Sequence, residues 1–124
     1  MESPQLKGRT VLILDDEPLI ALDIAQELEK AGASVVTANN LRAALKCIDE
    51  HSVSAAVIDC SLTEEDSAIL YGRFKEHSIP FIRYSGSTPG DLVRVDAPFL
   101  SKPASRGELT RAIGGLLAAN MVDL

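Results

Sequence analysis

Five short apolar runs alternate with segments of helical period, and this alternation constrains the fold of the 124-residue chain more than any other feature. Runs such as Val11–Leu14 and Ala55–Ile58 are continuously apolar, which is typical of strands buried on both faces. Strands that alternate with helices predict βαβ units, and therefore a parallel sheet covered by helices on both faces. The predicted strands are Thr10–Leu14, Ser34–Ala38, Ala55–Asp59, Pro80–Tyr84 and Phe99–Leu100.

The helices of this α/β fold are predicted from spacing and from capping residues. In Pro18–Ala31 the apolar residues Ile20, Ile24, Leu28 and Ala31 share one helical face, which we expect to be buried. Glu64–Glu76 also carries apolar residues at helical spacing, and Asn40 is the expected N-cap of a helix between the two segments. Ser105 followed by Glu108 predicts a capping box that opens the last helix. Residues 87–97 contain Pro and Gly and leave room for only a short fourth helix. We expect one domain over residues 1–124, with its core over about 8–118 and no output domain.

Composition excludes several classes of partner. The chain has 12 Lys and Arg against 18 Asp and Glu, a formal charge of −6 that opposes binding to nucleic acids and anionic membranes. No apolar stretch approaches the roughly 20 residues needed to span a bilayer, and the first residues lack the apolar core of a signal peptide. The two cysteines have no metal-ligand spacing. We therefore expect a cytoplasmic protein without a nucleic-acid or membrane partner.

Polar side chains stand at the carboxyl ends of four predicted strands. Asp15 and Asp16 follow the first strand, Asp59 ends the third, Ser85 follows the fourth, and Lys102 comes just after the fifth. In open α/β sheets, ligands bind outside the carboxyl ends of the strands, so these groups are expected to share one edge. Carboxylates, a hydroxyl and an ammonium group are together suited to Mg²⁺-assisted phosphorylation of a carboxylate.

This set of residues on a five-fold β/α alternation resembles the receiver domain of two-component response regulators, over about residues 8–118. The resemblance implies a doubly wound, flavodoxin-like five-stranded sheet with strand order 2-1-3-4-5. It also implies a phosphoprotein that accepts a phosphoryl group from a histidine kinase or phosphotransfer protein. Such a domain signals by changing its binding to a downstream protein, whose identity the sequence does not give.

The resemblance assigns a role to each site residue. Asp59 is the expected phosphoacceptor. Asp15, Asp16, Asp59 and the backbone carbonyl of Ser61 are the expected Mg²⁺ ligands, with Asp16 ligating directly and Asp15 largely through water. Taken alone, an Asp at a strand end only starts a turn, and an acidic pair there can simply cap a helix. The presence of all these groups together favours the phosphoacceptor and Mg²⁺-ligand roles over these purely structural ones.

The remaining assignments concern the phosphoryl group and the switch. Lys102 is expected to pair with the phosphoryl oxygens, and Pro103 has a structural role in the same turn. The Ser85 hydroxyl is expected to donate to the phosphoryl group, with Gly86 leaving space for it. Phe99 matches the switch aromatic of the family, although it could equally be a core residue.

Two other functions compete with this interpretation. The segment after Asp59 lacks the Pro and Gly common in receivers, which leaves open a pseudo-receiver that binds partners without phosphorylation. A phosphatase of the haloacid dehalogenase type would carry Asp-x-Asp on its first strand, whereas this chain has Asp15-Asp16-Glu17. We therefore expect a signalling phosphoacceptor rather than an enzyme.

Overall fold

Nine helices and strands make up the part of the chain that the computed structural model describes, namely residues 6–59, 62–85, 99–101 and 107–122. The strands are β1 (Thr10–Asp15), β2 (Ser34–Ala38), β3 (Ala55–Asp59), β4 (Phe81–Ser85) and β5 (Phe99–Ser101). The helices are α1 (Pro18–Lys30), α2 (Leu41–Glu50), α3 (Glu64–Glu76) and α4 (Glu108–Val122). The predicted strands are therefore present, with ends that differ by at most one residue, and so are the predicted helices other than the short fourth one.

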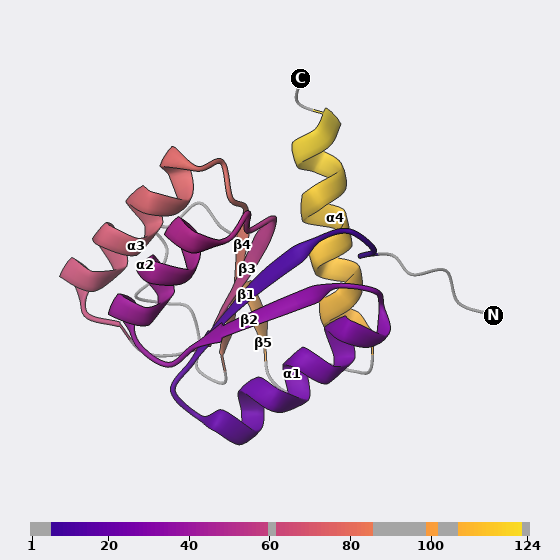
Figure 1. Ribbon diagram of the computed structural model, residues 1–124, viewed down its shortest axis with the longest axis horizontal. Helices are drawn as coiled ribbons and strands as arrows, with labels where there is room; N and C mark the ends of the chain where they lie inside the picture. The colour runs from indigo at the N-terminus through magenta and orange to yellow at the C-terminus, as the bar shows by residue number, and fades with distance from the viewer. Residues whose placement is uncertain (1–5, 60–61, 86–98, 102–106, 123–124) are drawn as a thin grey trace.

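The five strands form one sheet in the order β2-β1-β3-β4-β5, and every neighbouring pair is parallel. This confirms the predicted fold class and strand order. Helices cover both faces, with α1 and α4 on one side and α2 and α3 on the other (Figure 1). The short fourth helix predicted within residues 87–97 lies outside the described residues.

The sheet divides the hydrophobic core into two layers because successive strand residues point to opposite faces. On β1, Val11 and Ile13 pack with α1 and α4, whereas Leu12 and Leu14 pack with α2 and α3. All four of these side chains are fully buried. A strand buried on both faces has no polar alternation, which explains the continuous apolar runs of the sequence.

Local hydrogen bonds explain where the helices begin and end. The Asn40 side chain accepts a bond from the Ala43 N–H at 2.8 Å, which confirms Asn40 as the N-cap of α2. Thr63 caps α3 in the same way, by accepting from Asp66 N–H at 3.0 Å. After α1 the chain turns through Gly32, whose φ of +99° lies in the left-handed region that favours glycine.

Helix α4 begins later than the capping-box pattern predicts. Its first residue is Glu108, and the carbonyl of Gly107 accepts the first helical bond from Arg111 N–H at 3.0 Å. Gly107 is therefore the N-cap residue, and Ser105 lies outside the described residues. The φ of Gly107 is +83°, a conformation that side chains rarely adopt, which explains the glycine at this position.

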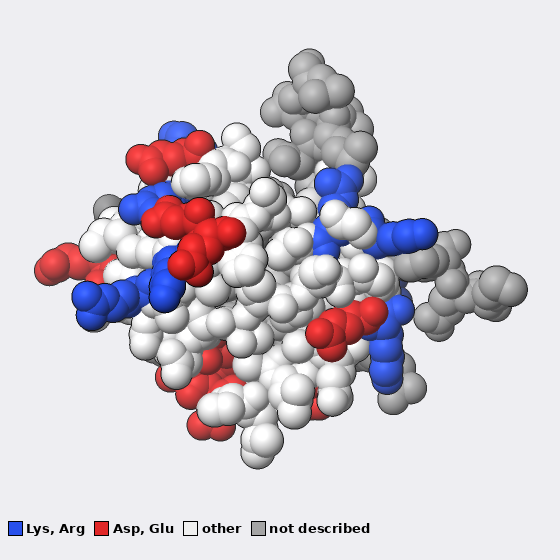
Figure 2. Space-filling view, viewed as in Figure 1, with Lys and Arg blue, Asp and Glu red and all other residues white. Residues whose placement is uncertain are grey.

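Charged side chains are distributed unevenly on the surface. In Figure 2, basic groups predominate on the side of α4 and the start of β1, whereas acidic and basic groups alternate over α2 and α3. One of these pairs joins the two helices, since Arg73 Nη1 lies 2.9 Å from Asp49 Oδ1. No helix in the described ranges is both long and apolar enough to cross a membrane.

Candidate functional site at the carboxyl edge of the sheet

The pairing of β1 with β3 places two of the predicted site residues next to each other. Asp15 and Asp59 are register partners and form the last pair of these two parallel strands. On the other side of β3, Ser85 and Ser101 are the last pair of β4 and β5, and Lys102 follows Ser101 in the sequence. The backbone thus brings Asp15, Asp59 and Ser85 to the same edge of the sheet.

The two carboxylates of the acidic pair have different surroundings. Asp15 is only 2% exposed, and its Oδ1 accepts a hydrogen bond from the Glu17 N–H at 2.8 Å. This bond fixes the Asp15 carboxylate in the turn between β1 and α1. Asp16 is exposed, and Glu17 occupies the N-cap position of α1. Of the two, Asp16 therefore has the carboxylate that is more accessible from solvent.

Several predicted site residues cannot be placed at the level of their side chains. Asp59, Ser85 and Phe99 have described backbones in β3, β4 and β5, and their side chains are outside the description. Ser61, Gly86, Lys102 and Pro103 lie entirely outside it, so the roles assigned to these residues remain predictions. Within the described ranges no three His, Cys, Asp or Glu side chains gather as a metal site. Of the four expected ligands, Asp15 and Asp16 are the two whose side chains the structure describes.

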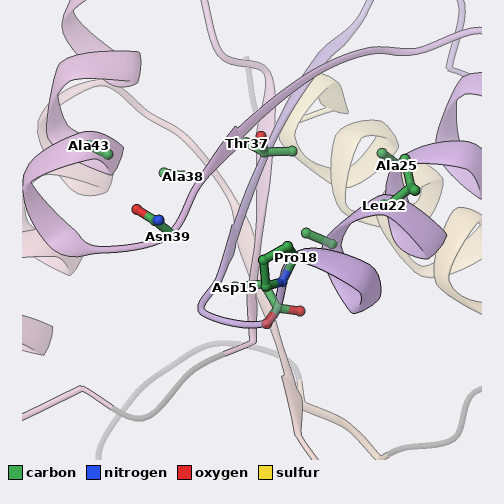
Figure 3. Close-up of a pocket in the computed structure, with 9 residues that line it drawn as sticks. Asp15, Pro18, Leu22, Ala25, Thr37, Ala38, Asn39 and Ala43 are labelled. Carbon is green, nitrogen blue, oxygen red and sulfur yellow. The ribbon is translucent and has the colours of Figure 1, made fainter.

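A cavity of about 430 Å³ lies beside Asp15, on the β2 side of β1. Four of its lining residues are alanines, which leave space between the start of α1, the end of β2 and the start of α2 (Figure 3). Its polar lining comes from Asp15, Thr37 and Asn39. The cavity therefore adjoins the acidic edge without lying between β1 and β3, where the acceptor is expected.

Helix α1 exposes two large apolar side chains near this edge. Leu19 is 77% exposed and Leu22 is 53% exposed, and Leu22 also lines the cavity. Exposed single apolar residues are ordinary, but these two lie on the first two turns of the helix that starts from the acidic pair. Sequence reasoning passed over them, although a helical projection places both away from the stripe of Ile24 and Leu28 that faces the core.

A second feature that sequence reasoning missed joins α1 to α4. Oε2 of Glu27 accepts hydrogen bonds from the backbone N–H of Thr110 at 3.3 Å and from its hydroxyl at 3.2 Å. The partners are 83 residues apart, and no sequence pattern connects a helical Glu to a Thr at that distance. Only the packing of the two helices on the same face of the sheet brings them together.

The fold and the acidic edge define a doubly wound α/β domain with a site at the carboxyl ends of its strands. The family model for the response regulator receiver domain matches residues 11–114. The chain therefore belongs to the response regulator receiver family and is a receiver domain of the two-component type. No curated protein matches the sequence.

Solved structures of receiver domains are similar to this chain over most of its length. A CheY-like receiver domain protein from Methanospirillum hungatei JF-1 is 23% identical with a TM-score of 0.80, covering 94% of this chain and 98% of its own. The receiver domain of the Francisella response regulator 1452 is 26% identical, with a TM-score of 0.73 and coverage of 90% and 98%. The receiver domain of a signal transduction histidine kinase from Syntrophus aciditrophicus is 24% identical, with a TM-score of 0.76 and coverage of 90% and 92%.

Proposed function

We propose that this receiver domain accepts a phosphoryl group on Asp59 from a histidine kinase or a phosphotransfer protein, in a reaction that requires Mg²⁺. The observation that carries the proposal is the register pairing of Asp15 with Asp59 at the carboxyl edge of the sheet. This pairing brings an acidic turn, with one buried and one exposed carboxylate, beside the expected acceptor.

The transfer exchanges one bond to phosphorus for another. A carboxylate oxygen of Asp59 forms a bond to phosphorus as the bond from phosphorus to the donor's imidazole nitrogen breaks. The bonding pair stays on that nitrogen, and the product is an acyl phosphate. Both the nucleophile and the phosphoryl oxygens are negative, so the reaction needs positive charge around them. The Lys102 ammonium is the residue of this chain that would supply it.

The residues at this edge fit a magnesium ion. Mg²⁺ prefers oxygen ligands and keeps several of its waters, so a few protein oxygens are sufficient. Asp15, Asp16, Asp59 and the carbonyl of Ser61 would hold the ion, which when bound offsets negative charge on the phosphoryl oxygens. In this chain Asp15 would also keep its hydrogen bond from the Glu17 N–H, which holds the Asp15 carboxylate in one orientation within the turn.

The surface beside the acidic edge supports a protein as the phosphoryl donor. A donor histidine that reaches Asp59 must bring its own protein over the carboxyl edge of the sheet. Leu19 and Leu22 expose apolar surface on α1 next to this edge, and the cavity lined by Leu22 offers space for an apolar side chain. Burying these leucines would favour the complex by the transfer of apolar surface out of water.

Signalling would then proceed through altered binding to a downstream protein, because the formal charge of −6 opposes nucleic-acid partners. A cytoplasmic location follows from the same proposal, since the donor kinase takes its phosphoryl group from a nucleotide inside the cell. The chain would act as a phosphoacceptor and not as an enzyme with a small-molecule substrate.

Intact-mass spectrometry after incubation with acetyl phosphate tests the proposal. The wild-type chain should gain one phosphoryl group in Mg²⁺ and none in EDTA, and Asp59→Asn should gain none. Asp23→Asn is the matched control, because Asp23 is an exposed carboxylate of α1 away from the register pair. Full phosphorylation of Asp59→Asn would contradict the assignment of the acceptor. A folded wild-type chain that takes no phosphoryl group from either acetyl phosphate or kinases would instead support the pseudo-receiver.

A further inference from the structure

Arg83 places a charge in the middle of a buried strand. Its side chain is 6% exposed, and among the described residues Arg83 is the one buried cation and Asp15 the one buried carboxylate. A charge in a protein core is costly, and an apolar side chain of similar volume is often at least as stable there. Strands buried on both faces normally carry apolar residues at such positions, so packing alone does not explain Arg83.

The two buried charges stand on either side of the strand that carries the expected acceptor. Asp15 is the register partner of Asp59, the last residue of β3. Arg83 is the register partner of Ile58, the residue before Asp59, from the opposite side of β3. Neighbouring strands lie about 4.8 Å apart and residues advance by about 3.3 Å, which puts the Cα atoms of Arg83 and Asp59 about 6 Å apart. The end of β3 therefore has a buried negative charge on one side and a buried positive charge on the other.

Arg83 lies on the face of the sheet that α2 and α3 cover. Its register partner Ile58 belongs to the core layer on this face, and paired residues point to the same side. Ile82, next to Arg83 in β4, belongs to the opposite layer. The Arg83 side chain is thus within the core, where salt screens charges much less than in solvent. Unit charges about 10 Å apart in such surroundings change an equilibrium by about tenfold.

We propose that Arg83 is a buried counter-charge for phosphorylation: its guanidinium offsets, through space, the negative charge that Asp59 gains with the phosphoryl group. The inference rests on the proposed function, in which Asp59 is the acceptor. There a carboxylate with one negative charge becomes an acyl phosphate with about two. Arginine side chains stay positively charged in proteins, so the counter-charge is permanent. The same charge repels a cation, and Arg83 therefore also weakens Mg²⁺ binding at the acidic edge.

The test measures phosphorylation by acetyl phosphate and Mg²⁺ binding in the same variants. Acetyl phosphate gives its phosphoryl group to an Asp59 oxygen and leaves as acetate. Arg83→Gln removes the charge and keeps a polar side chain. At saturating Mg²⁺ it should lower the rate constant for phosphorylation by about tenfold, and in calorimetry it should tighten Mg²⁺ binding by about threefold or more. Arg83→Lys keeps the charge and should stay close to the wild type in both measurements.

Two further variants control for the loss of an arginine and for packing. Arg73→Gln is the matched control, because Arg73 lies in the last turn of α3, a helix whose first turn is the one that follows the carboxyl end of β3. Its phosphorylation rate and Mg²⁺ affinity should equal those of the wild type. Arg83→Met is a second uncharged variant, with an apolar side chain that a core accommodates, and should behave like Arg83→Gln. Urea denaturation checks that each variant is folded.

The two expected effects have opposite signs, which separates the charge of Arg83 from general damage. A distorted edge would lose both rate and Mg²⁺ affinity, and an uncharged variant with weakened or unchanged Mg²⁺ binding would overturn the inference. An Arg83→Lys variant as slow as Arg83→Gln would also overturn it, because shape and not charge would then be responsible. Equal rates in Arg83→Gln and Arg73→Gln would overturn it while the proposed function stood, and a wild-type chain without phosphorylation would overturn both.

Discussion

Asp15 and Asp59 are neighbours across the sheet, although 43 positions in the sequence separate their strand ends, because β1 and β3 pair in parallel with both residues in the last position. A shift of one residue in this register would move every side chain of one strand to the opposite face. Because β1 is apolar on both faces, its register depends on how Val11 and Ile13 fill one core layer and Leu12 and Leu14 the other, and not on polarity. The geometry of the acidic edge is in this sense a consequence of the core.

The two members of the acidic pair should respond differently to substitution. Asp16→Asn should raise the Mg²⁺ dissociation constant by about tenfold or more, since a factor of ten needs only about 1.4 kcal/mol. Without Mg²⁺ the same variant should melt a few degrees higher than the wild type, because one of the negative charges expected at the Mg²⁺ site is gone. Melting curves with and without Mg²⁺ measure both effects. Glu17→Gln is the neighbouring control, and an Asp16→Asn variant with unchanged Mg²⁺-dependent stabilisation would remove Asp16 from the ligand set.

The exposed leucines of α1 should matter for a protein donor and not for a small one. Leu19→Asp combined with Leu22→Asp should slow phosphotransfer from autophosphorylated histidine kinases, because the apolar surface that the donor covers would become charged. Phosphorylation by acetyl phosphate should stay at the wild-type rate, as this donor needs no docking surface. Transfer of radiolabelled phosphate from a panel of purified kinases to the wild type and to the double variant measures the difference. Equal transfer to the wild type and the variant would show that the donor does not use this part of α1.

Adjacent residues of α3 provide a matched test of the core. Leu70 is 0% exposed and Ile69 is 50% exposed. Leu70→Ala should lower the free energy of unfolding by about 2–5 kcal/mol, because it leaves a cavity in the layer that also contains Phe74. Ile69→Ala should change it by less than about 1 kcal/mol, as surface substitutions usually do. Urea denaturation measures both values, and similar losses would contradict the burial of α3.

Two glycines of α4 should respond to alanine in opposite directions. Gly107→Ala should destabilise the protein by about 1 kcal/mol or more, because a side chain is strained at its φ of +83° and would contact Arg111. Gly115→Ala should stabilise it by about 0.5–1 kcal/mol, since the added methyl group meets nothing within 4 Å apart from the adjacent backbone of its own helix, and alanine favours the helix. Thermal denaturation distinguishes the two, and stabilisation by Gly107→Ala would place the start of the helix elsewhere.

The thiol of Cys47 should be less reactive than an ordinary cysteine. Burial is the main cause that raises its pKa, and the negative charge of Glu50 raises it further, against a smaller opposite effect of Lys46. The folded protein holds the thiol proton more tightly than the unfolded chain does. The contribution of Cys47 to the stability of the fold is therefore fully present below the ordinary thiol pKa, and it is lost as the pH rises through the raised pKa. Alkylation by iodoacetamide in a Cys60→Ser variant should therefore become fast only at higher pH than for a free thiol. A rate equal to that of a free thiol would contradict the shift.

The sequence determined the fold class because five apolar runs of strand length alternate with segments of helical period. Continuous apolar runs specify strands buried on both faces, and the capping oxygen of Asn40 places the start of α2 within one residue. The face of a helix was predicted less well. Ile24 and Leu28 are buried as expected, whereas Ile20 and Ala31 are only partly buried and Ala21 and Ala25 take their place. The spacing of apolar residues fixes a stripe on the helix, and the sheet decides how far that stripe is rotated.

The acidic edge could be predicted because Asp15, Asp59 and Ser85 each stand at the end of a strand, and parallel strands end at the same side of a sheet. Only the tertiary structure decided which carboxylate is buried, which leucines of α1 remain exposed, and that Glu27 caps α4. These features depend on contacts between residues that are distant in the chain. Local sequence fixes backbone conformation, while the packing of strands and helices on one another fixes which distant side chains meet.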